Sequence, residues 1–166
     1  MPTSALRCLY NALIECHLIY GIEVWGNSPF TKSTFILQKR AVRTITRSGC
    51  RAFTEPLFKR QNLLKIHDLF KLRACVFAYS YVNTLLPSSF NNFYSSHPNA
   101  SMITTRSSQR KHLYLIRSRT NFSSKSAYPI IALLWNNLQE DMKSVRSKTS
   151  FKNKLKQYYL SLYTNI

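Results

Sequence analysis

The residues of this sequence that could do chemistry are mainly cationic side chains. Lysine and arginine together number 24, against six aspartates and glutamates, so the formal net charge is +18 in 166 residues. No acidic residue occurs between positions 69 and 139. A charge of this size opposes compaction unless the basic side chains face water or an anionic ligand. The composition therefore predicts a polyanionic partner, of which nucleic acid is the commonest.

Four cations lie close together in one segment, namely Lys39, Arg40, Arg43 and Arg47. On a helix this spacing gathers them on one arc, where guanidinium groups can meet successive phosphates. The alternative is an ordinary solvated face, but such a face usually mixes both charges to gain about 0.2–0.5 kcal/mol per i,i+4 pair. This segment contains no acid, which favours phosphate contact.

A second basic stretch, 106–125, also lacks acidic residues. Its candidate contacts to nucleic acid are Arg106, Arg110, Lys111, Arg117 and Arg119. Tyr114 and Phe122 could stack on bases at about 1–3 kcal/mol each where exposed, although a place in the core is the commoner one for such rings. The apolar group at 113–116 allows a short β-hairpin within this stretch.

Other chemistries lack the residue patterns that they need. Cys8 and Cys16 on one helix would be about 12 Å apart, too far for two ligands of one zinc ion. Glu140 and Asp141 are consecutive and diverge on a helix, so they do not form the converging carboxylates of a two-metal site. No glycine-rich phosphate loop is present. We therefore predict no catalytic residue, no metal and no cofactor, and no enzymatic activity of this chain alone.

The sequence also bears on cellular location. The four cysteines, at positions 8, 16, 50 and 75, show no pairing pattern, which is typical of reduced thiols inside the cell. The longest apolar run, 127–135, is far shorter than the ~20 residues that span a bilayer. Arg7 and Glu15 interrupt any secretory-type apolar core. We expect an intracellular protein, nuclear or cytoplasmic, without a membrane span.

The elements that must position these cations are predicted to be helices in a mainly α, helical-bundle fold. Apolar residues at helical spacing indicate a first helix over 4–20, with Ser4 as its N-cap. A second helix ends at Ser48-Gly49 and carries the cations of 39–47 opposite an apolar face. That predicted face comprises Phe35, Leu37, Ala41, Val42 and Ile45, while Ile36 falls within the basic arc.

The remaining helices are predicted from Pro56 onward. Pro56 opens a short helix, and the segment 66–85 is apolar around its whole circumference, which is typical of a central, buried helix. A helix over 127–138 is expected to be interrupted near Pro129. Ser150 is predicted to cap an amphipathic C-terminal helix, whose apolar stripe comprises Phe151, Leu155, Tyr158 and Leu162.

Four segments carry a family resemblance, and they read YGIEVWGN at 20–27, LQKRAVRTI at 37–45, WNNL at 135–138 and FKNKLK at 151–156. In order and spacing they resemble the region downstream of the polymerase core in reverse transcriptases of non-LTR retrotransposons, of the LINE and jockey type. The resemblance covers nearly the whole chain. It implies a helical, thumb-like unit. The stretch up to Thr105, rich in serine, asparagine and histidine, indicates a linker, which predicts a thumb-like unit at 1–95 and a smaller basic unit, helical with some strand, at 96–166 that packs on the first.

The resemblance also implies a function. In that family the upstream palm holds catalytic aspartates in a Phe/Tyr-Ala-Asp-Asp motif, and the region downstream holds template RNA and primer. This sequence has no Asp-Asp pair, which implies a fragment without polymerase activity of its own. The implied partners are the RNA or DNA backbone and the palm and fingers of a reverse transcriptase. Lys39, Arg40 and Arg43 match the family's basic helix and would grip that backbone.

The chain also departs from the family pattern. Gln139 stands where a proline usually follows the Trp-Asn-x-Leu block, and Tyr128-Pro129 stands where a glycine is usual. A second interpretation is a non-catalytic remnant of a decayed element, whose basic surface docks an acidic protein or an anionic membrane. The opening Met1-Pro2 fits a truncated element, and an amphipathic C-terminal helix rich in lysine could lie on such a membrane.

Overall fold

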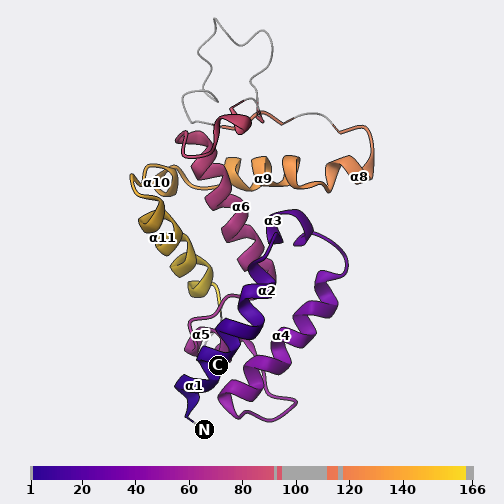
Figure 1. Cartoon of the computed structure of the whole chain (residues 1–166), viewed down its shortest axis with the longest axis vertical. Helices are drawn as coiled ribbons and strands as arrows, with labels where there is room; N and C mark the ends of the chain where they lie inside the picture. The colour runs from indigo at the N-terminus through magenta and orange to yellow at the C-terminus, as the bar shows by residue number, and fades with distance from the viewer. Residues whose placement is uncertain (1, 92, 95–111, 116–117, 164–166) are drawn as a thin grey trace, which may run out of the picture. The chain divides into compact units, whose positions relative to one another are not determined.

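The computed structural model describes residues 2–91, 93–94, 112–115 and 118–163. This part of the chain is mainly helical and contains no strand, so the predicted fold class is confirmed (Figure 1). Its elements are α1 (Thr3–Tyr10), the π-helical η1 (Asn11–Glu15), α2 (Cys16–Ile19), α3 (Ile22–Trp25), α4 (Thr31–Thr46), α5 (Glu55–Arg60), α6 (Ile66–Val82), the 3₁₀ turn η2 (Ser88–Phe90), α8 (Asn121–Ser124), α9 (Ala127–Asn136), α10 (Glu140–Lys143) and α11 (Lys148–Ser161).

Contacts along the chain group it into two compact units. One unit comprises the residues up to Phe70 together with those from Lys156 onward, and the other comprises Lys71–Leu155. Helices α6 and α11 therefore each contribute residues to both units. The sequence predicts a different division, between residues 95 and 96. In the structure, residues 71–94 belong to the second unit and the end of α11 belongs to the first.

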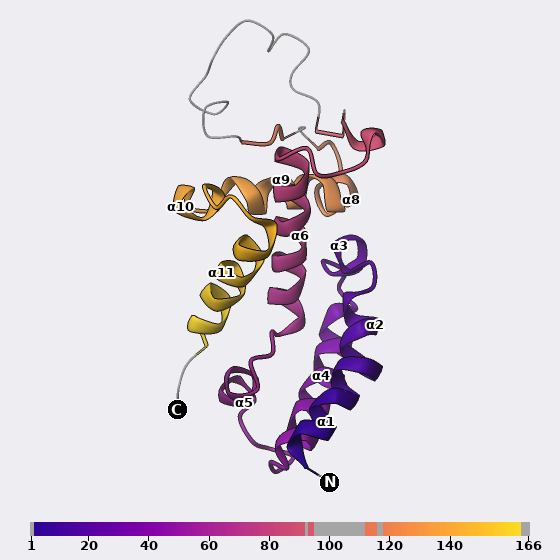
Figure 2. The ribbon, with the colours of Figure 1, turned by 60° about the vertical axis from the view of Figure 1, so that its left-hand side comes forward.

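In the first unit, α1 and α4 lie side by side and run in opposite directions (Figure 2). The buried side chain of Gln38 joins them. Its Nε2 donates to Tyr10 Oη at 3.1 Å and to the Leu64 carbonyl at 2.9 Å, and its Oε1 accepts from the Ile66 N–H at 2.9 Å. Burial raises the pKa of Tyr10 to about 12. Gln38 thus links α1 and α4 to the start of α6.

The buried face of α4 differs in part from the predicted one. Thr31, Gln38, Val42 and Ile45 are buried. Leu37, which the apolar pattern places in the core, is 61% exposed. Consecutive residues on a helix point about 100° apart, so turning Gln38 toward its three partners turns Leu37 into solvent. A buried glutamine with all its groups hydrogen-bonded is compatible with a core position.

The N-terminal helical segment is not one regular α-helix. The π-helical turn η1 interrupts it between α1 and α2, and its wider i→i+5 turn shifts the residues that follow. Tyr10, just before this turn, and Leu18, after it, are buried, whereas Leu13, an apolar residue at helical spacing within the turn, is 64% exposed. The N-cap position is Pro2 rather than the predicted Ser4.

The N-terminus of α6 is completed by a residue from the far end of the chain. Tyr163 Oη accepts from the Lys65 N–H at 2.9 Å and donates to the Asp68 carboxylate at 2.7 Å. The first N–H groups of a helix have no partner within it. The Tyr163 hydroxyl therefore accepts from the backbone N–H just before α6, and the Gln38 side chain accepts from the first backbone N–H of the helix itself.

The C-terminal helix is present, but its cap and buried stripe differ from the prediction. It begins at Lys148, before Ser150. Its buried side chains are Phe151, Leu155, Tyr159 and Leu160, and the first three follow an i,i+4 spacing. Tyr158 and Leu162 are 40% and 60% exposed. Hydrogen bonds hold Tyr163 at the start of α6. The buried stripe therefore continues through Tyr159 to Tyr163, and not through Tyr158 to Leu162 as predicted.

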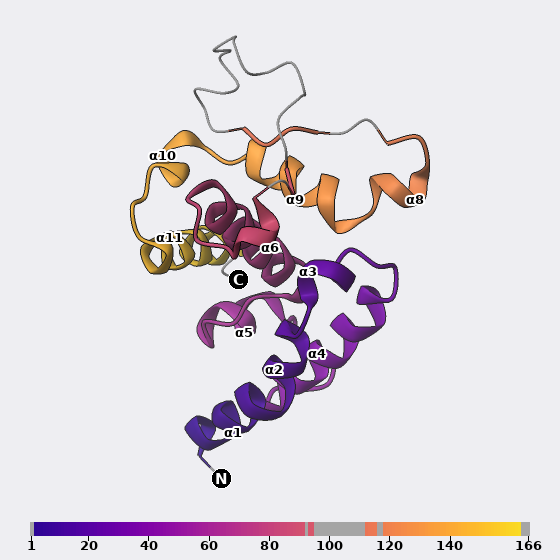
Figure 3. The ribbon, with the colours of Figure 1, turned by 45° about the horizontal axis from the view of Figure 1, so that its top comes forward.

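Figure 3 shows the backbone of α6, α9 and α11. Aromatic side chains of these three helices form the core of the second unit. The Tyr79 ring lies 4.7 Å from the Phe151 ring and 6.5 Å from Trp135, measured between centroids. Pro129 does not interrupt α9, contrary to the prediction, because it occupies the first turn, where a missing N–H costs no intrahelical bond. The helix therefore runs unbroken to Asn136.

The predicted β-hairpin is absent from the described part of 106–125. Residues 121–124 form α8 instead, and Thr120 caps it by accepting from the Ser123 N–H. Both backbone groups of Leu113 bond to the side-chain amide of Asn136, at 2.8 and 2.9 Å. These are the groups that a neighbouring strand would use, so Asn136 takes the place of a strand partner. Residues 106–111 and 116–117 lie outside the described residues.

Candidate nucleic-acid interface

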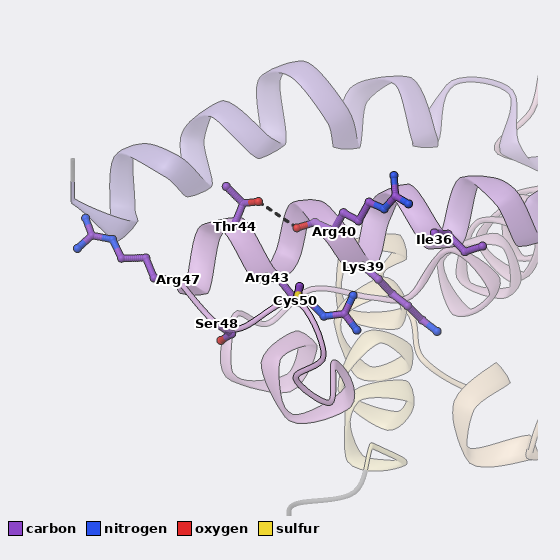
Figure 4. Close-up of a pocket in the computed structure, with 8 residues that line it drawn as sticks. All are labelled: Ile36, Lys39, Arg40, Arg43, Thr44, Arg47, Ser48 and Cys50. Carbon is purple, nitrogen blue, oxygen red and sulfur yellow. Dashed lines mark hydrogen bonds between the residues drawn. The ribbon is translucent and has the colours of Figure 1, made fainter.

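A hollow of about 710 Å³ lies along the C-terminal half of α4 and the turn after it (Figure 4). It is lined by Ile36, Lys39, Arg40, Arg43, Thr44, Arg47, Ser48 and Cys50. All four cations that the sequence predicts on this helix are among them, and no lining residue is acidic. We call this surface the basic hollow.

The four cations do not form one continuous row. In Figure 4, Lys39 and Arg43 extend to the same side of α4 and Arg40 extends to the other. Arg47 lies past the end of the helix, as its C-cap residue. Arg40 and Arg47 are exposed, while Lys39 and Arg43 are half-buried. The basic hollow therefore presents cations on two flanks.

The two half-buried cations are held in place by neutral groups. Arg43 Nε donates to the Ala52 carbonyl at 3.1 Å, and a guanidinium carries four further N–H donors. Lys39 Nζ lies 4.3 Å from the centre of the Phe35 ring, a cation–π contact that leaves the positive charge unneutralised. These contacts orient both side chains without an acidic partner.

Three of these cations have no carboxylate partner. Within the described ranges, Lys39, Arg40 and Arg43 form no ion pair, whereas Lys65 pairs with Glu55 and Lys143 with Glu140. Like charges held close together repel one another, and a bound anion removes that repulsion. The basic hollow is therefore suited to phosphate groups.

The backbone of Arg47, at the end of the basic hollow, is strained. Its φ of 52° and ψ of 35° are left-handed, a conformation that costs an L-residue about 1–2 kcal/mol. The Ser48 N–H bonds to the Arg43 carbonyl at 3.0 Å and the Arg47 N–H to the Thr44 carbonyl at 3.2 Å. Together these bonds form a Schellman motif, which usually places glycine at this position. Such strain is often retained at functional sites.

We expect Arg47→Gly to raise the free energy of unfolding by about 0.5–1 kcal/mol, because relief of the left-handed strain exceeds glycine's entropic cost. Urea denaturation measures the effect. Arg47→Ala is the matched control, since it removes the charge and keeps the strain. Equal free energies of unfolding for the glycine and alanine variants would contradict the claim that the backbone of Arg47 is strained.

The second set of predicted contacts is described only in part. Arg119 is exposed, directly before the cap of α8 in the second unit. The other four, Arg106, Arg110, Lys111 and Arg117, lie outside the described residues. Tyr114 and Phe122 are 41% and 88% exposed, so the expectation that these rings belong to the core is wrong.

Several residues of the basic hollow are missed by the sequence patterns. Thr44 and Ser48 add hydroxyl groups to its lining, and Thr44 lies one helical turn after Arg40, where helical spacing could have identified it. Ile36 is identified correctly within the basic arc. The contact between Arg43 and Ala52 follows from the turn after α4, and no local sequence signal indicates it.

Other kinds of site find no support. Within the described part of the chain, no three histidine, cysteine or acidic residues lie close enough to hold a metal ion, and none of its helices is long and apolar enough to cross a bilayer. All four cysteines are free thiols. No protein-family model, curated protein or solved structure matches this chain. Function is therefore inferred from the basic hollow and from the four resembling segments.

Proposed function

We propose that this chain binds nucleic acid by contacting backbone phosphates in the basic hollow. The observation that carries the proposal is that four cationic side chains line one hollow without a single carboxylate. Arginine forks match phosphate oxygens. The hydroxyl group of Thr44 donates to the Arg40 carbonyl at 3.1 Å, and that of Ser48 lies 2.9 Å from Thr46 Oγ1, so the contacts to phosphate belong to the cations.

The chemistry of the lining defines the kind of recognition. Lysine and arginine contacts to phosphate fix the position of a strand but carry no sequence information. A protein that binds in this way releases counterions from the nucleic acid, so its affinity falls steeply with salt. We expect similar affinity for unrelated sequences and a strong dependence on ionic strength.

The four resembling segments support a more specific assignment. In this proposal the chain is the thumb and downstream part of a non-LTR retrotransposon reverse transcriptase, and it holds template and primer inside the cell. The segment 37–45 that resembles the family's basic helix is also the part of α4 that contributes Lys39, Arg40 and Arg43 to the basic hollow. Catalysis would belong to an upstream palm, so the chain alone would bind nucleic acid without copying it.

The test is the salt dependence of binding to mixed-sequence RNA and DNA, followed by fluorescence anisotropy. Four phosphate contacts predict a slope of log K against log salt of about −2.8 for a single strand and about −3.6 for duplex DNA. Flotation with anionic vesicles at the same salt concentrations is the comparison. Salt-independent binding, or binding to vesicles but not to nucleic acid, would contradict the proposal.

A further inference from the structure

The turn after α4 places an aromatic ring in water next to the basic hollow. Cys50 lines the hollow, and the Ala52 carbonyl accepts the hydrogen bond from Arg43 Nε at 3.1 Å. The next residue is Phe53, whose side chain is 78% exposed. A phenyl ring left in water forgoes the hydrophobic stabilisation of burial. Its attachment next to Ala52, which holds Arg43 of the basic hollow, points to a binding role.

The backbone on both sides of Phe53 is anchored. The Ala52 N–H bonds to the Gly49 carbonyl at 3.0 Å, and the carbonyl of the buried Thr54 accepts from the Phe58 N–H at 2.9 Å, in the first turn of α5. Phe53 is therefore held by a turn tied to Arg43 on one side and to α5 on the other. The ring has a fixed attachment point next to the basic hollow.

We propose that Phe53 stacks on an unpaired base of a single-stranded nucleic acid whose phosphates occupy the basic hollow. The proposal rests on the function proposed above and narrows its ligand. A base inside a duplex already stacks on both faces, whereas an unpaired base can stack on an aromatic side chain. A cationic groove combined with an exposed aromatic ring is the arrangement by which proteins bind single strands without sequence preference.

A second exposed phenylalanine in the same unit provides a matched control. Phe30 is 81% exposed and lies at the N-cap position of α4. It lies thirteen positions before Arg43, which corresponds to about 20 Å along a helix axis, and six positions before Ile36, which corresponds to about 9 Å. Phe30 resembles Phe53 in type and exposure but lies outside the lining of the basic hollow, at the end of α4 away from Arg43 and Arg47.

The experiment compares Phe53→Ala and Phe30→Ala for binding to a single-stranded RNA and to the duplex of the same sequence. Loss of one stacking contact predicts about tenfold weaker single-strand binding for the Phe53 variant. Its duplex binding, and both affinities of the Phe30 variant, should stay as in the wild type. Phe53→Trp should keep the affinity, and single-strand binding should quench its added fluorescence, because the indole would stack on the base.

The outcomes separate this inference from the proposed function. Wild-type single-strand affinity in a folded Phe53→Ala protein would overturn the stacking role and leave phosphate binding intact. Equal weakening of single-strand and duplex binding would also overturn it, since that indicates a general effect on the basic hollow. Failure of the wild-type chain to bind any nucleic acid would remove both proposals together.

Discussion

Replacing Gln38 with leucine is expected to lower the free energy of unfolding by about 4 kcal/mol, because three buried hydrogen-bonding groups would lose their partner. Those groups are Tyr10 Oη, the Leu64 carbonyl and the Ile66 N–H, on residues that are at most 5% exposed. Domains of this size are stable by only about 5–15 kcal/mol. Urea denaturation followed by circular dichroism measures the loss.

The neighbouring residue supplies a matched control. Leu37→Gln makes the reverse exchange at a position that is 61% exposed, and surface changes of this kind usually stay within about 0.5 kcal/mol. Tyr10→Phe removes one of the three bonds and should cost about 1 kcal/mol, a graded effect that remains measurable if the Gln38 variant does not fold. Equal stability of the Gln38→Leu and Leu37→Gln variants would show that the buried amide is unimportant.

The second large effect is expected on binding. Replacing Arg40, Arg43 and Arg47 together by glutamine should weaken single-stranded RNA binding about 100-fold near 0.1 M salt, since three phosphate contacts are lost. The slope of log K against log salt should become shallower by about 2. Preference among sequences should not change, because contacts to phosphate carry no sequence information. Fluorescence anisotropy over a salt series gives all three results.

The effect of net charge on binding must be distinguished from the effect of the basic hollow. Arg146, Lys148 and Lys152 are exposed cations elsewhere in the chain, and changing them to glutamine also lowers the formal net charge of +18 by three. This control should weaken binding only slightly, through long-range attraction that salt screens. If both triple variants bind equally weakly, binding is spread over the whole basic surface and the hollow has no special role.

The helices and the basic hollow could be predicted from the sequence for one physical reason. Side chains that must stay charged face water, so Lys39, Arg40 and Arg43 mark the outer side of α4 whatever packs behind it. Folding also brings no acidic residue into the lining of the hollow. Composition and helical spacing therefore predict this surface without knowledge of its neighbours.

What could not be predicted depends on contacts between distant residues. Gln38 is polar by composition, and only its bonds to Tyr10, Leu64 and Ile66 make it a core residue. The π-helical turn likewise changes which residues of the first helical segment are buried. A helical pattern reports which residues share a face, but small rotations set by tertiary partners decide whether Leu37 or its neighbour turns inward.

The bonds that Tyr163 makes to Lys65 and Asp68 have a consequence for how this chain acquires its structure during synthesis. Residues 1–70 leave the ribosome long before the tyrosine that completes the start of α6 has been added. A nascent chain therefore carries that helix end incompletely bonded until residue 163 has been added, and such late closure lengthens the period in which apolar surface is open to chaperones or to aggregation.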